Sequence, residues 1–245
     1  MKNYSIGSWI TTTDISVVEL MSTFPFNWLC IDLEHTATDY KDLLTLVSII
    51  QNKNKKVFVR VGSNDKLIIK RALDIGADGI IVPMINNIDD AKKAIDHIFY
   101  PPDGKRGVGL FRAQGYGFDF ENYRDIKSKK IEFIAQIEHV DAIDNLDSIL
   151  SLKNLHGTII GPYDLSSSIG KTGELDSKEL KDLVNKYESI SKKYNKKIGF
   201  HVVPIDYKKV KEKIDTGYNF IAFGFDLNFM GSSIKSEFEN LEIDE

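Results

Sequence analysis

The sequence predicts a (β/α)8 barrel, the TIM barrel of the α/β class, formed by one domain over residues 1–245. Short runs rich in β-branched and aromatic residues occur eight times along the chain. Seven longer segments with helical periodicity separate them, and this alternation indicates βαβ units with parallel strands. Eight such units usually need about 250 residues and close most economically into a barrel. An open, doubly wound sheet is the alternative.

The apolar runs are the expected strands, because each holds at least two side chains that favour strands. They lie at 4–10, 28–32, 56–60, 79–83, 132–137, 157–161, 197–201 and 220–225. The helices expected between them lie at 14–22, 39–51, 66–74, 88–97, 142–150, 177–192 and 207–214. Several of these helices begin at polar residues that commonly cap a helix, such as Asn64 or Asp65 before Lys66, and Asp176 or Ser177 before Leu180.

Three segments do not follow this rhythm. Residues 99–123 are too long for an ordinary connection, so we expect a functional loop or lid there. Residues 170–174 read as a polar loop. The acidic end, 237–245, is expected to be a frayed tail or one that docks on a partner.

Composition favours an enzyme or binding protein for a small molecule. The chain has 32 basic and 36 acidic residues, a net charge of -4, and no basic stripe for nucleic acid. Cys30 is the only cysteine, so it forms no internal disulfide, and its apolar surroundings predict a buried thiol in a cytoplasmic protein. We see neither a signal sequence nor an apolar run long enough for a membrane span.

The carboxyl ends of barrel strands are where active sites form, so polar residues there carry the most weight. Glu138 and Asp164 follow neighbouring strands, and their carboxylates can converge on Mg²⁺ or Mn²⁺. The alternative is that they only cap the following helices. Residues 161–165 would offer backbone N–H groups, at the start of a short helical turn, to a substrate carboxylate, or would form no more than a tight turn.

Arg60 and His35 also follow strands. Arg60 could stabilise an enolate, or it could pair with Asp32 or Glu34 as a structural element. His35 is the preferred general base because it combines a strand-end position with two nearby acids. The remaining histidines carry less weight: we expect His97 and His156 at the surface and His139 on the opposite face from Glu138. His201 either lines the pocket or lies outside it.

A series of short motifs resembles the HpcH/HpaI aldolase family over nearly the whole chain. In order, they are Gly7-Ser8-Trp9, Ile31-Asp32-Leu33-Glu34-His35, Arg60-Val61, Leu73-Asp74-Ile75-Gly76-Ala77, Pro83-Met84, Tyr100-Pro101-Pro102 with Arg106-Gly107-Val108-Gly109, Gln136-Ile137-Glu138, Asp144-Asn145-Leu146 and Gly161-Pro162-Tyr163-Asp164-Leu165-Ser166. The resemblance implies a metal-dependent class II pyruvate aldolase. Such an enzyme reversibly cleaves a 4-hydroxy-2-oxo acid to pyruvate and an aldehyde through a metal-stabilised enolate.

The resemblance also implies a role for individual residues. They are His35 as proton acceptor, Arg60 as transition-state stabiliser, Asp74 as the acid that raises the basicity of that histidine, Glu138 and Asp164 as ligands of Mg²⁺ or Mn²⁺ with Co²⁺ as a further candidate, and Gln136, Tyr163 and Asp164 as pyruvate-binding positions. Asp74 is expected at the C-terminal end of a helix, on the barrel face away from the site. Its role therefore rests on the resemblance alone.

Four positions depart from the family pattern, namely Leu33, Thr36, Tyr163 and His201. The pyruvate half of the site keeps its residues, but the aldehyde half becomes bulkier and more polar. This favours a sugar-derived or otherwise hydroxylated aldehyde.

Three other functions are weaker. A class I aldolase needs a Schiff-base lysine, and 157–164 contains none. A lyase for CoA thioesters such as citryl-CoA or malyl-CoA needs a basic patch for the CoA phosphates, which we cannot assign. A non-catalytic ligand-binding barrel would not need the set of candidate residues described above.

The end of the chain predicts a homo-oligomer. After the eighth strand, apolar residues recur in an otherwise acidic segment too short to wrap the barrel: Phe229, Met230, Ile234, Phe238, Leu241 and Ile243. Relatives that the chain resembles exchange their C-terminal helix and form hexamers of swapped dimers, which would bury such a stripe. The 99–123 loop would then reach the neighbouring subunit.

Overall fold

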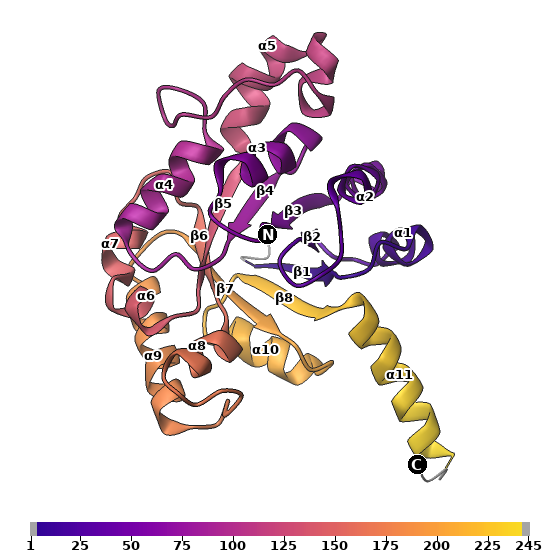
Figure 1. Cartoon of the computed structure of the whole chain (residues 1–245). Coiled ribbons are helices and arrows are strands. Elements are labelled where there is room, and N and C mark those ends of the chain that lie inside the picture. The colour runs from indigo at the N-terminus through magenta and orange to yellow at the C-terminus, as the bar shows by residue number, and fades with distance from the viewer. Residues whose placement is uncertain (1–3, 242–245) are drawn as a thin grey trace.

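A computed structural model describes residues 4–241 and contains a closed parallel barrel (Figure 1). Its strands pair in chain order, and the last pairs with the first. They are β1 (Ser5–Ile10), β2 (Trp28–Asp32), β3 (Lys56–Arg60), β4 (Gly79–Val82), β5 (Glu132–Ile137), β6 (Gly157–Ile160), β7 (Lys197–Val202) and β8 (Phe220–Phe225). The predicted (β/α)8 barrel is confirmed, and the doubly wound sheet is wrong.

Helices follow the strands and cover the outside of the barrel. They are α1 (Ile15–Thr23), α2 (Tyr40–Asn52), α3 (Lys66–Ile75), α4 (Ile88–Ile98), α5 (Phe120–Asn122), α6 (Val140–Asp144), α7 (Leu146–Leu150), α8 (Pro162–Ser168), α9 (Lys178–Ser191), α10 (Tyr207–Asp215) and α11 (Asp226–Asn240). Of the two expected caps, Asp65 caps α3 by accepting hydrogen bonds from the N–H groups of Leu67 and Ile68. Ser177 stands at the N-cap of α9, but its side chain makes no capping bond.

One expected helix differs from the structure. The helix expected at 142–150 is two short helices, α6 and α7, which meet at Asn145. The short helical turn expected at 161–165 is the start of a seven-residue helix, α8, with Pro162 in its first turn. Proline suits this position because its missing N–H would have no partner there.

Alternate side chains of each strand face the barrel interior, where aromatic rings fill the centre. Trp28 stacks on Phe220 with ring centroids 4.2 Å apart, and Phe58 meets both rings edge-on. Cys30 is fully buried beside them, which confirms the predicted thiol environment. At the N-terminal ends of the strands, Glu132 pairs with Lys56 and Lys197 and closes the bottom of the barrel.

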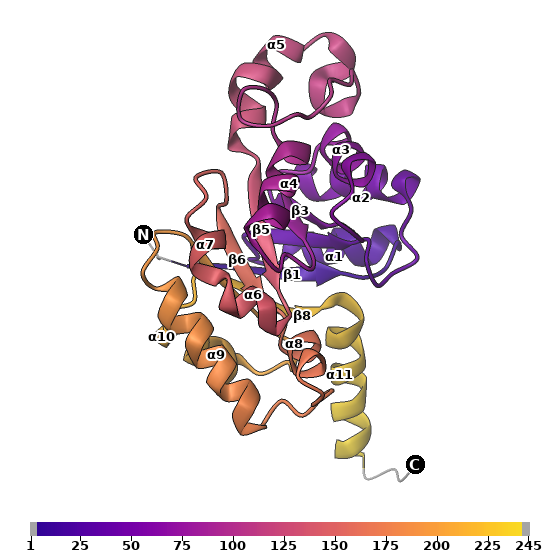
Figure 2. The same ribbon diagram turned by 60° about the vertical axis from the view of Figure 1, so that its left-hand side comes forward.

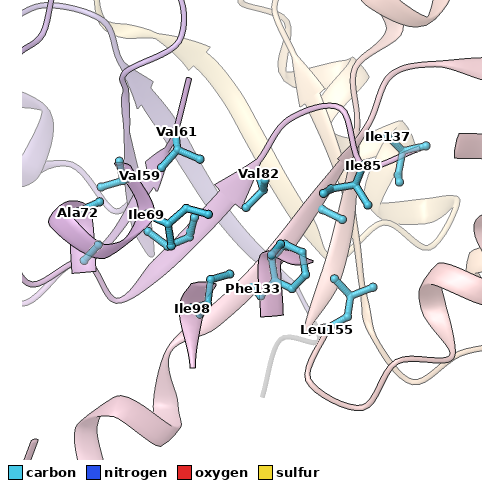
Figure 3. Packing of buried hydrophobic residues seen from close by; sticks show 14 of the residues in the cluster. Val59, Val61, Ile69, Ala72, Val82, Ile85, Ile98, Phe133, Ile137 and Leu155 are labelled. Carbon is cyan, nitrogen blue, oxygen red and sulfur yellow. The ribbon is translucent and has the colours of Figure 1, made fainter. Parts of the chain in front are cut away.

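The opposite strand faces pack against the helices in a second, larger core. Figure 3 shows part of it, where Val59 and Val82 of the sheet meet Ile69 and Ala72 of α3. These side chains are fully buried. This layer holds the barrel together and leaves the interior residues at the strand ends for the site.

Residues 99–130 form an excursion that stands out from the barrel beside α3 and α4 (Figure 1). It is not a plain loop, because it contains a 3-10 helix at Arg112–Gly117, then α5 and further helical turns up to Lys130. The buried Arg106 anchors it by donating to Asp74 (2.7 Å) and to the Tyr123 hydroxyl (3.0 Å).

The last helix, α11, leaves the barrel and points into solvent (Figure 2). Residues 237–240, expected to belong to a frayed or docked tail, form the end of α11. Residues 242–245, which include Ile243 of the apolar stripe, lie outside the described residues. Its apolar side chains Met230, Ile234 and Phe238 are about half exposed. No helix within residues 4–241 is both long and apolar enough to span a bilayer.

Candidate active site

A cavity of about 740 Å³ opens at the carboxyl ends of the strands and contains most of the predicted site residues. His35, Arg60, Gln136, Tyr163 and Asp164 line it. The two-residue period of each strand turns Arg60 and Gln136 into the barrel mouth. The same period places Trp9 and His201 there.

Arg60 is held from three sides. Its Nε and Nη2 atoms donate to the two oxygens of Asp32 at 2.9 and 2.7 Å, and its Nε lies 3.3 Å from Glu34. The guanidinium also sits over the Trp9 ring, 4.4 Å from its centroid. The structural pairing that the sequence allowed is therefore present, and it fixes the guanidinium at the cavity wall.

Glu138 is 4% exposed and is not among the residues that line the cavity, but it contacts two that are, Gln136 and Gly161. One carboxylate oxygen accepts the N–H of Met84 at 2.7 Å, and the other accepts the side-chain amide of Gln136. Met84 has a left-handed backbone, with φ of 53°, which is a strained conformation for this residue type. Sequence reasoning missed this backbone donor, although the Pro83-Met84 motif was visible.

Gly161 lets the strands approach each other here. A Cβ atom at this position would lie 3.2 Å from the Glu138 Cβ and 3.4 Å from its carboxylate oxygen. Glycine therefore leaves room beside Glu138 that any other residue would fill.

The carboxyl groups at the mouth share one electrostatic environment. The pKa of Glu34 is raised to about 7, mainly by burial. The Arg60 guanidinium lowers this pKa, and the negative charges of Glu138, Asp32 and Asp164 raise it. Burial also raises the pKa of Glu138, opposed by its two hydrogen bonds and reinforced by the Asp164 charge. The charge of Asp164 therefore acts on Glu138.

The oxygen donors at this place suit a divalent cation. Asp164 is exposed, and its carboxylate forms no hydrogen bond or ion pair with another residue of 4–241. The buried Oε1 atom of Gln136 has no hydrogen-bond partner in the same range. No group of three or more acidic, histidine or cysteine residues within 4–241 forms a closed metal cage. Two carboxylates beside open space fit an ion that keeps other ligands.

His35 and Asp74 lie in different surroundings. The His35 side chain is 64% exposed, and its Nε2 atom is 3.8 Å from Glu34. The Asp74 carboxylate instead accepts hydrogen bonds from Arg106 and Gln114 of the 99–130 excursion. Asp74 does not line the cavity, so the structure does not pair it with His35 in this chain.

The other histidines have separate roles. His139 caps α6 by accepting the N–H of Asp141. His156 is partly exposed: its ring lies against Phe99, and its Nδ1 accepts the N–H of Phe133. His97 is also only partly exposed. His201 does line the cavity.

The fold and the cavity define a barrel enzyme with a carboxylate pair and an arginine at its mouth. The model of the HpcH/HpaI aldolase/citrate lyase family matches residues 5–232, so the chain belongs to this family. A 2-dehydro-3,6-dideoxy-6-sulfogluconate aldolase of Pseudomonas putida is 30% identical over 93% of this chain and 88% of its own length. A 2-keto-3-deoxy-L-rhamnonate aldolase of Escherichia coli is 32% identical over 90% of this chain and 82% of its own length.

A solved structure agrees with the fold. An HpcH/HpaI aldolase/citrate lyase family protein from Burkholderia cenocepacia superposes with a TM-score of 0.92 at 24% identity, and covers 98% of this chain and 95% of its own. The family resemblance inferred from the motifs is confirmed. The chain is a carbon–carbon lyase of the class II aldolase type.

Proposed function

We propose that this aldolase reversibly cleaves a 4-hydroxy-2-oxo acid to pyruvate and an aldehyde. The C3–C4 bond breaks, its electron pair stays on C3 as an enolate, and the C4 hydroxyl loses its proton as C4 becomes the aldehyde carbonyl. Protonation of the enolate at C3 then gives pyruvate. The main support is the Arg60 guanidinium, which Asp32 and Trp9 fix at the wall of a cavity that also contains His35, Gln136 and Asp164.

Glu138 and Asp164 would hold the divalent cation that this family uses, with Mg²⁺, Mn²⁺ and Co²⁺ as candidates. When bound, the ion supplies Lewis acidity to the substrate oxygens. The oxygen donors, the open space beside Gly161 and the unpaired Gln136 oxygen support this assignment.

The chain's own side chains account for the remaining steps. Arg60 would stabilise the developing enolate oxygen, because a fixed cation beside that oxygen needs no reorganisation during the reaction. His35 would take the C4 hydroxyl proton during cleavage and return it during condensation. Gln136 and Tyr163 would position pyruvate. The part assigned to Asp74 stays a prediction, since its contacts here are with the 99–130 excursion.

We further propose that residues 1–245 act as one domain in a homo-oligomer, a hexamer built from swapped dimers. The outward course of α11 and its half-exposed apolar residues support this assembly. The 99–130 excursion exposes further apolar side chains, with Phe118 98% exposed. A cytoplasmic location stays a prediction from the single, unpaired cysteine.

Proton exchange tests the proposed function. The purified protein with Mn²⁺ or Mg²⁺ is incubated with pyruvate in D₂O, and loss of the methyl proton signal is followed by NMR. Exchange should require the metal, and addition of an aldehyde should give a 4-hydroxy-2-oxo acid. A folded protein that catalyses neither reaction with any of the three metals would contradict the proposal.

A further inference from the structure

A second cavity lies at the other end of the barrel from the mouth. Its volume is about 510 Å³, and it lies between the ends of α2 and α3 and the base of the 99–130 excursion. Asp78 and Ile131 line it, and these residues immediately precede β4 and β5. The cavity is therefore beside the N-terminal ends of the strands, whereas the candidate active site is at their carboxyl ends. No step of the proposed reaction uses it.

Arg112 is held in a fixed position in the wall of this cavity. Its Nη1 atom donates to the carbonyl oxygen of Ile75 and to the side-chain oxygen of Gln51, both at 2.9 Å. The Nε and Nη2 atoms form no hydrogen bond or ion pair with another residue of 4–241. These two atoms carry parallel N–H groups, the pair with which Arg60 holds Asp32 at the mouth. Such a pair matches two oxygens of one anion.

Gly76 leaves the space that this guanidinium occupies. Its φ of 118° is left-handed, and a Cβ atom there would lie 2.6 Å from the Nη1 atom of Arg112. The carbonyl of Gly76 also accepts the side-chain amide of Gln51 at 2.9 Å. Any other residue at this position would be strained and would displace the guanidinium. The glycine that ends α3 and the glutamine near the end of α2 therefore fix Arg112 together.

Two lysines from the end of the excursion add positive charge to the same cavity. Lys127 and Lys130 both line it. The Lys127 ammonium pairs with Asp119 at 2.6 Å, but Lys130 forms no hydrogen bond or ion pair with another residue of 4–241. Among the lining residues, all within 4–241, Asp78 is the only carboxylate, and one of its oxygens already accepts the N–H of Val57 at 2.9 Å. The cavity is therefore positively charged in a chain whose net charge is -4.

The surface around the cavity is basic as well. Lysine-rich runs at 53–56, 127–130 and 192–197 are far apart in the sequence, but each lies at or just before the start of a strand, β3, β5 or β7. Because parallel strands start at the same end of a barrel, the fold gathers these runs on one face. Glu132 neutralises only part of this charge, by pairing with Lys56 and Lys197. A face of one sign raises the local concentration of anions near the cavity.

We propose that this cavity binds a phosphate group, either as the free ion or as part of a small phosphorylated metabolite. The parallel N–H groups of Arg112 would take two phosphate oxygens, and the unpaired ammonium of Lys130 would take a third. Both residues belong to the excursion, whereas Gln51 and Gly76 belong to the barrel. A bound phosphate would therefore stabilise the excursion against the barrel. This inference does not depend on the proposed function.

Other anions fit these donors less well. A single carboxylate has two oxygens, so it would fill the paired N–H groups of Arg112 and leave Lys130 without a partner. Single-stranded nucleic acid usually stacks its bases on exposed aromatic rings. Tyr123 is the aromatic residue that lines this cavity, but it is buried, and its hydroxyl is already bonded to Arg106 at 3.0 Å. A phosphate group uses all the free donors and needs no aromatic ring.

The test is isothermal titration calorimetry of the protein, in its native assembly and at low salt, with three probes. They are inorganic phosphate, glucose 6-phosphate and glucose. Both phosphates should bind and glucose should not. A lower Kd for glucose 6-phosphate would identify a phosphate ester as the ligand, and equal Kd values would identify the free ion. Failure of both phosphates to bind, or equal binding of glucose, would overturn the inference.

Variants then assign the binding to this cavity. Lys130→Gln should weaken phosphate binding by about tenfold or more, because it removes one charge-assisted hydrogen bond. Lys129→Gln is the matched control, since Lys129 is also exposed and removes the same charge from the same face but does not line the cavity. It should change the Kd much less. Equal weakening by the two variants would show a general attraction to the basic face and would reject the cavity as the site.

Two further measurements separate this site from the mouth and from effects on folding. Arg60→Lys should leave the phosphate Kd unchanged, and a phosphate that loses affinity in Arg60→Lys but not in Lys130→Gln would be bound at the mouth, which would overturn the inference. Hydrogen exchange is followed in the wild-type protein, where no variant has to fold. Glucose 6-phosphate should slow amide exchange in 112–130, and unchanged exchange at a saturating concentration would contradict the link between excursion and barrel.

Discussion

Replacement of Arg60 separates its part in catalysis from its part in folding. Asp32 has a side chain that is only 3% exposed, and Arg60 is its ion-pair partner. Arg60→Ala would leave this buried carboxylate uncompensated, at a cost of about 3–5 kcal/mol. That is a large part of the total stability of an ordinary domain. Loss of activity in Arg60→Ala would therefore report on folding as well as on chemistry.

Arg60→Lys is the sharper change. Lysine keeps a positive charge beside Asp32 but cannot form both guanidinium hydrogen bonds, so unfolding should become easier by about 1.5–3 kcal/mol. The enolate would lose a fixed donor, which typically costs 10²- to 10³-fold in rate, or about 2.7–4 kcal/mol. Exchange of pyruvate methyl protons and aldol cleavage should fall by the same factor, because both pass through that anion.

The assays are NMR exchange in D₂O, pyruvate release from a 4-hydroxy-2-oxo acid, and urea unfolding of the same preparation. Arg71→Lys is the matched control, because Arg71 is an exposed residue of α3 that stacks on Tyr40 outside the cavity. It should change neither rate. A folded Arg60→Lys protein with the wild-type exchange rate would refute the role given to Arg60.

Three further predictions concern the metal, the base and the assembly. EDTA should abolish cleavage, and Mg²⁺, Mn²⁺ or Co²⁺ should restore it; full activity after exhaustive chelation would speak against metal dependence. Glu138→Gln or Asp164→Asn should weaken Mn²⁺ binding, measured by calorimetry, without unfolding the barrel. His35→Ala should lower cleavage by about 10²- to 10⁴-fold and exchange much less, whereas equal losses would assign His35 to enolate formation. Deletion of 234–245 should dissociate the oligomer in light scattering and reduce activity, and an intact chain that is a fully active monomer of 27.8 kDa would contradict the swap.

The barrel and the mouth residues follow from local sequence patterns, which explains why they could be predicted. Strand periodicity places Arg60 and Gln136 at the mouth, and strand order places Glu138 and Asp164 after the adjacent strands β5 and β6. The amide of Met84 could not be predicted, because a left-handed backbone at a non-glycine residue depends on its surroundings. The orientation of His201 also depends on a distant partner, the carbonyl of Gly224, which no spacing along the chain indicates.

Asp74 shows the limit of sequence reasoning more clearly. Its position at the end of α3 was predicted from helix periodicity, but its partners come from the 99–130 excursion, whose course has no periodic signal. The same holds for α11, where the apolar positions were visible but the direction of the helix was not. Both features depend on contacts between segments far apart in the sequence.

The buried thiol of Cys30 can be used to measure how often the barrel opens. The thiol lies on β2 inside the ring of strands, and burial raises its pKa well above the ordinary value. Thiol reagents react with the thiolate, so the native thiol is both unreachable and in the unreactive form. Alkylation therefore requires an opening of the structure that exposes β2, either between strands or from the mouth of the barrel. Since the chain has one cysteine, the rate at which a label enters native protein reports this opening at a single site.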